Sequence, residues 1–86
     1  MEEDIVGKYL DSCCALIGVL NRAKIERSIL SKDRIDCLMW NCKTIQDFAE
    51  KAHIAGEIDI ERKTYLDIQA ITYMNKLKAK RGDLDE

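Results

Sequence analysis

SKDRIDCLMWNCKTIQDFAEKAHI, residues 31–54, is the stretch that decides the fold class of this chain. Its apolar side chains recur in alternating steps of three and four, as one face of an α-helix requires. Ser31 is placed to cap the first turn, and Leu30 and Ile35 are placed for a hydrophobic staple across it. These signals predict a helix over residues 32–54 with one stripe facing the core. The stripe consists of Ile35, Leu38, Cys42, Ile45, Ala49 and Ala52.

Residues 3–25 come before this stretch and have apolar side chains at the same spacing. The acidic residues at positions 2–4 suit the positive end of a helix dipole. We predict a helix over residues 3–25, with Cys13 near the centre of its apolar stripe and Cys14 at the edge. A short connection follows, although residues 23–30, AKIERSIL, could instead continue the first helix or form a short helix of their own.

A third helical segment begins after Gly56 and Asp59. Gly56 suits the left-handed end of the preceding helix, and Asp59 can cap the next one. We predict this helix over residues 60–81, with Gly82 ending it before the short acidic tail 83–86. The basic residues just before Gly82 would complement the negative end of the helix dipole. The core stripe of this helix consists of Leu66, Ala70, Tyr73 and Leu77.

The length and composition of the chain set its architecture. It has 86 residues and no proline, which favours long helices within one domain, residues 1–86. Three helices of roughly 20 residues, each about 30 Å long and joined by short connections, predict an all-α fold. We expect an antiparallel three-helix bundle, either alone or assembled into a helical homodimer.

Two of the predicted helices carry a second apolar strip, on the side away from the core stripe. The strip on residues 32–54 holds the only Trp and the only Phe of the chain, and the other strip lies on residues 60–81. Exposed apolar patches on small proteins mark contact surfaces, and Trp and Tyr are frequent anchors there. The alternative is that neighbouring helices cover both strips. The predicted interface residues are Trp40, Thr44, Phe48, Ile60, Tyr65, Ile68 and Ile71.

The simplest occupant of such a surface is a second copy of the chain, because two-fold dimers are the commonest oligomers. A different protein is the other expected partner. A net charge of -2 argues against a protein whose main task is to bind nucleic acid. We therefore expect a small acidic protein-protein interaction module: an adaptor, inhibitor or regulator, of a kind that phage and viral genomes often contain.

The sequence gives only weak signals for a catalytic, cofactor-binding or metal-binding site. Adjacent Cys13 and Cys14, and the five-residue step from Cys37 to Cys42, lack the spacing that zinc chelation favours. His53 lies eleven residues after Cys42, about 16 Å along one helix, which is too far for a Cys-His pair. The glycines are scattered, so no phosphate-binding loop is formed. We expect no enzymatic activity, no cofactor and no metal.

Two other functions compete with the interaction module. Residues 47–68, DFAEKAHIAGEIDIERKTYLDI, have Ala52 and Gly56 four apart, as in a helix-turn-helix. A DNA-binding regulator is therefore the first alternative, although acidic residues on the second helix would face the phosphates. The second alternative is a thiol-based sensor or enzyme that uses Cys13 and Cys14.

The compartment is predicted from the start of the chain and its longest apolar run. That run, Cys13 to Leu20, is far shorter than the roughly 20 residues that span a bilayer. The first residues are acidic, where a signal peptide needs basic ones. We expect a cytoplasmic protein with reduced cysteines and no membrane partner, in the host cytoplasm if it is phage or viral.

Overall fold

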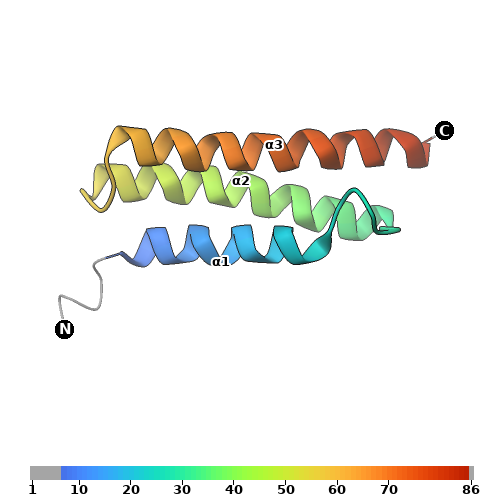
Figure 1. Ribbon diagram of the computed structural model, residues 1–86, viewed down its shortest axis with the longest axis horizontal. Helices are drawn as coiled ribbons and strands as arrows, with labels where there is room; N and C mark the ends of the chain where they lie inside the picture. Colours follow the sequence, from blue (N-terminus) through green and yellow to red (C-terminus); the bar gives the residue numbers. More distant parts are fainter. Residues whose placement is uncertain (1–6, 86) are drawn as a thin grey trace.

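Three α-helices make up the computed structural model, which describes the backbone of residues 7–85 and the side chains of residues 7–82. They are α1 (Lys8–Ala23), α2 (Lys32–Ile54) and α3 (Ile60–Asp85), and residues 7–85 contain no strand. Figure 1 shows them side by side, with α2 in the middle and the two connections at opposite ends of the molecule. α2 packs along both neighbours, whereas α1 and α3 touch each other little. The expected all-α helical bundle is confirmed.

α2 has the bounds that the sequence pattern predicts. Ser31 Oγ accepts a hydrogen bond from the Arg34 amide at 3.1 Å, so the predicted cap is formed. Leu30 is half-buried against the core cluster that contains Ile35, as a staple requires. All members of the predicted stripe are buried: Ile35, Leu38, Cys42, Ile45, Ala49 and Ala52.

One hydrophobic cluster joins the three helices and the first connection. The predicted stripes of α1 and α3 both contribute to it, and only Tyr73 of the α3 stripe is half-buried rather than buried. The thiol of Cys13 donates a long hydrogen bond to the Ile45 carbonyl at 3.5 Å, which places α1 directly on α2. The buried members outside α2 are Cys13, Leu20, Ile25, Leu66, Ala70 and Leu77.

α1 is shorter than the sequence pattern predicts. It begins after Gly7, whose φ of 82° does not continue a helix. It ends before Lys24, which has a φ of 48° and closes the helix by donating its backbone N–H to the Asn21 carbonyl at 3.3 Å. The prediction for residues 2–6 lies outside the described residues.

The connection between α1 and α2 is neither a continued helix nor a separate one, so the short connection is confirmed. A backbone turn holds it, because the N–H groups of Arg27 and Ser28 donate to the Lys24 carbonyl at 2.9 and 3.0 Å. Ile25 is only 4% exposed. The turn therefore adds an apolar side chain to the core that the helical pattern of α1 does not supply.

A Schellman motif ends α2 as the sequence predicts. Gly56 has a φ of 80°, and its N–H donates to the His53 carbonyl at 3.1 Å. The N–H of Glu57 donates to the Ala52 carbonyl at 2.9 Å, which is the second bond of the motif. Asp59 Oδ1 then accepts from the amide three residues on at 2.8 Å, so the predicted cap of α3 is also confirmed.

α3 continues through Gly82 to Asp85, and the prediction that Gly82 ends the helix is wrong. Gly82 does not have a positive φ, so the left-handed ending that glycine favours does not form there. The last turn has no basic residue, and the predicted complement of the helix dipole is also wrong. The basic side chains instead tie α3 to the first connection and to the start of α2. The pairs are Lys76 with Glu26, Lys80 with the Ser28 carbonyl, and Arg81 with Asp36.

Candidate functional site

The outer face of α3 is the candidate site. It lies opposite the core stripe of the helix, since Ile68 is two residues from both Leu66 and Ala70 and therefore about 200° away around the helix. Ile68 is 54% exposed and Tyr65 is 57% exposed. Covering the exposed half of each such side chain would contribute about 1 kcal/mol. The outer face consists of Ile60, Thr64, Tyr65, Ile68, Ile71, Thr72 and Asn75.

Apart from Glu61, which lies seven residues before Ile68 on the same side of the helix, this face has uncharged side chains, in a chain of which 35% of the residues are charged. The Thr64 hydroxyl donates to the Ile60 carbonyl and the Thr72 hydroxyl donates to the Ile68 carbonyl, each at 2.8 Å. Both hydroxyl donors are therefore satisfied inside the helix. A partner that covers the face leaves no threonine donor unpaired, so the usual penalty for burying a hydroxyl is small.

One charged residue lies near each end of the face. Glu61 lies in the first turn of α3, and Lys78 lies 17 residues later. Both are exposed, and neither has an ion-pair partner among the side chains of residues 7–82. The outer face thus has a negative end and a positive end, about 25 Å apart at 1.5 Å per residue.

The predicted interface residues of α2 are not alike in the structure. Trp40 is 68% exposed. Thr44 is half-buried, and its hydroxyl donates to the Trp40 carbonyl at 3.0 Å. Phe48 is half-buried against the core, with its ring centroid 5.9 Å from that of Tyr9 in α1. Neighbouring packing therefore covers part of the α2 strip, as the alternative interpretation expected, and leaves Trp40 as its exposed member.

Trp40 and the outer face of α3 point in different directions. Trp40 is two residues from both Leu38 and Cys42, so it lies opposite the α2 stripe just as Ile68 lies opposite the α3 stripe. Because α2 and α3 bury their stripes against each other, their opposite faces diverge. One flat partner cannot cover Trp40 and Ile68 together.

Among the side chains of residues 7–82, two exposed large apolar residues were not among the predicted interface residues. Ile29 is fully exposed in the first connection, and Ile54 is 77% exposed at the end of α2. A helical projection cannot predict the exposure of Ile29, because that residue is not in a helix. Ile54 lies within about 40° of Trp40 around α2, so the same projection could have found it.

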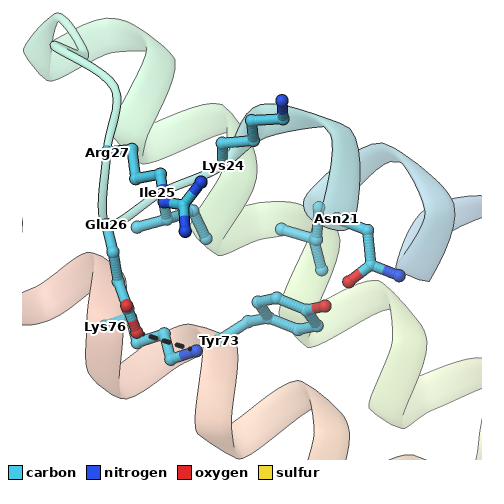
Figure 2. Close-up of a pocket in the computed structure, with 8 residues that line it drawn as sticks. Asn21, Lys24, Ile25, Glu26, Arg27, Tyr73 and Lys76 are labelled. Atoms are coloured by element: carbon cyan, nitrogen blue, oxygen red, sulfur yellow. Dashed lines mark ion pairs between the residues drawn. The ribbon is translucent and has the colours of Figure 1, made fainter.

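A cavity of about 250 Å³ lies between the first connection and α3. Figure 2 shows Lys76 of α3 reaching towards the connection, where its Nζ atom meets the Glu26 carboxylate at 3.0 Å, while the Tyr73 ring turns to the side of Asn21 in α1. The hydrogen bond from Lys76, and then its charge, lower the pKa of Glu26. Lys76 Nζ also lies 5.7 Å from the Tyr73 ring centroid. The charges of Lys76 and Glu26 compensate each other, so this wall of the cavity joins α3 to the connection.

The cysteines do not form a reactive pair. All four are free thiols, and Cys13 and Cys42 are buried while Cys14 and Cys37 are exposed. Burial, with a smaller contribution from the charge of neighbouring Cys14, raises the pKa of Cys13 from 9.0 to about 11. Burial likewise raises the pKa of Cys42 to about 11. The reactive thiolate form is disfavoured at both buried positions.

The described residues contain no group of three or more His, Cys, Asp or Glu side chains arranged to hold a metal ion. Among the same residues, no helix combines the length and apolarity that crossing a bilayer demands. His53 and Cys42 both lie in α2, eleven residues apart, which is too far for a Cys-His pair.

Comparison with known proteins identifies no relative that indicates a role for this chain. The chain matches no protein-family model, no curated protein and no solved structure.

Proposed function

We propose that this chain is a non-enzymatic protein-protein interaction module, an antiparallel three-helix bundle that acts in the cytoplasm through the outer face of α3. Its role would be that of an adaptor, inhibitor or regulator. The observation that carries the proposal is the mostly uncharged outer face itself, with half-exposed Tyr65, Ile68 and Ile71 and with threonine hydroxyls already bonded within the helix. When a protein covers such a face, apolar surface is buried and the penalty for burying polar groups is small.

The free state of the four cysteines supports the cytoplasmic assignment, because reducing compartments keep thiols unpaired. The raised pKa of Cys13 speaks against the thiol sensor or enzyme that would use Cys13 and Cys14, since the buried member of that pair stays protonated near neutral pH.

The arrangement of α2 and α3 gives the helix-turn-helix alternative no support. In that motif the two helices cross at about 90–120° so that the second can enter the major groove. Here α2 and α3 lie alongside each other (Figure 1). Lys76 and Arg81, which a phosphate-binding end would use, are engaged with Glu26 and Asp36.

Site-specific photo-cross-linking tests the proposed function in cells that express the protein naturally. The photoreactive amino acid p-benzoylphenylalanine replaces Tyr65 on the outer face, and in a matched control it replaces the exposed Asp11 on α1. We expect a light-dependent protein adduct from position 65 and none from position 11. An equal yield at both positions, or no adduct at position 65, would contradict a binding role for this face.

A further inference from the structure

We propose that the partner on the outer face of α3 is a second copy of this chain, with the two α3 helices packed antiparallel about a two-fold axis. This inference rests on the proposed function, because it names the occupant of the same face. The two-fold axis passes between residues 69 and 70 of each copy, at the midpoint between Glu61 and Lys78.

The order of side chains on the face is self-complementary about this midpoint. In an antiparallel pair, residues at equal distances on either side of the axis face each other. Ile68 of one copy then faces Ile71 of the other, and Thr64 faces Asn75. The apolar centre of one face thus meets the apolar centre of the next, and the Asn75 amide can donate to the Thr64 hydroxyl oxygen, which can still accept a hydrogen bond.

Charge selects the antiparallel direction. Glu61 and Lys78 each lie about 13 Å from the axis, so Glu61 of one copy faces Lys78 of the other at both ends of the pair. A parallel pair would instead place Glu61 beside Glu61 and Lys78 beside Lys78. Because neither residue has an ion-pair partner within residues 7–82, both are available for the contact between copies.

The size of the face sets the strength of the contact. A single pair of helices buries an area at the low end of protein interfaces, which corresponds to weak or transient complexes. We therefore expect a dissociation constant in the micromolar range. The dimer would form and separate with changes in protein concentration.

Charge reversal tests the antiparallel pair in the purified protein by sedimentation velocity. The variants Glu61→Lys and Lys78→Glu each place like charges opposite each other at both ends, and each is expected to dimerise roughly tenfold more weakly than the wild type. Mixing the two variants restores opposite charges at both ends of the mixed dimer. The mixture is therefore expected to associate within about threefold of the wild-type affinity.

Lys43→Glu is the matched control, since it changes the net charge as Lys78→Glu does but at an exposed site on α2. It is expected to dimerise like the wild type, and far-ultraviolet circular dichroism checks that every variant is folded. A mixture as weak as the single variants would overturn the antiparallel arrangement.

A wild-type chain that is monomeric up to about 0.5 mM would overturn the self-association. In that event, an adduct of position 65 with a different protein leaves the proposed function standing, whereas the absence of any adduct removes both proposals.

Discussion

Replacing Gly82 by alanine is expected to make the protein more stable, because Gly82 lies inside α3 and not at its end. The sequence pattern predicts the opposite result. A glycine that ends a helix has a left-handed backbone, and alanine is strained there. In the structure Gly82 has no positive φ, and a β-carbon added to it would meet no atom within 4 Å.

The size of the effect follows from helix propensity. Alanine is more favourable than glycine by about 0.8–1.0 kcal/mol inside a helix. Gly82 is only three residues from the last helical residue, where helices fray, so we expect a gain of about 0.5 kcal/mol. In a domain of this size such a gain raises the Tm by about 2–4 °C.

Thermal unfolding followed by circular dichroism measures the change, and Gly56→Ala is the matched control. Gly56 has a φ of 80° in the motif that ends α2, so alanine there is expected to lower the stability by about 1 kcal/mol. The two identical substitutions should therefore shift the Tm in opposite directions. A lowered Tm for Gly82→Ala would refute the continuous α3.

Other substitutions and conditions test the packing of α1 and α2. Lys24→Gly is expected to stabilise the protein by about 0.5–1 kcal/mol in chemical denaturation, because the φ of 48° at Lys24 suits glycine better than lysine; a loss of stability would contradict that backbone. Cys14 should react with a thiol reagent much faster than buried Cys13 in the native protein, as peptide mass spectrometry would show, and the reverse order would contradict the packing of α1. The free energy of unfolding should fall as the pH rises from about 9 to 11, because folded Cys13 and Cys42 keep protons that the unfolded chain releases. The fall should be smaller in Cys42→Ala, and a slope equal to that of the wild type would contradict this cause.

The elements that sequence predicts well are those with signals at both ends. α2 has a capping Ser31, an uninterrupted stripe and a terminating Gly56, and its bounds follow directly. The stripes of α1 and α3 were also predictable, because side chains three and four residues apart share one face of any helix.

The ends of α1 and α3 depend on information that periodicity does not contain. Glycine is compatible with a helix interior and with a left-handed ending, so its identity alone cannot distinguish Gly7 from Gly82. Tertiary contacts from the preceding turns, such as that of Lys80 with the Ser28 carbonyl, support α3 up to its last turns.

The candidate site was predictable only in part, because periodicity describes one helix at a time. Projection of one helix shows that Ile68 lies opposite the α3 core stripe, and the structure gives it an exposed side chain. Projection cannot show what the neighbouring helices cover. It therefore could not predict that Phe48 packs near Tyr9, or that Trp40 and the α3 face point in different directions.

The central claim is that the outer face of α3 binds a second copy of the chain, and sedimentation equilibrium of the wild type and Ile68→Glu tests it most directly. Ile68 is 54% exposed, so Ile68→Glu should leave the Tm of the dilute monomer nearly unchanged. We predict that the wild-type mass rises from 9.9 kDa towards twice that value with concentration, while Ile68→Glu stays monomeric. Equal masses for the two proteins at every concentration would contradict the claim.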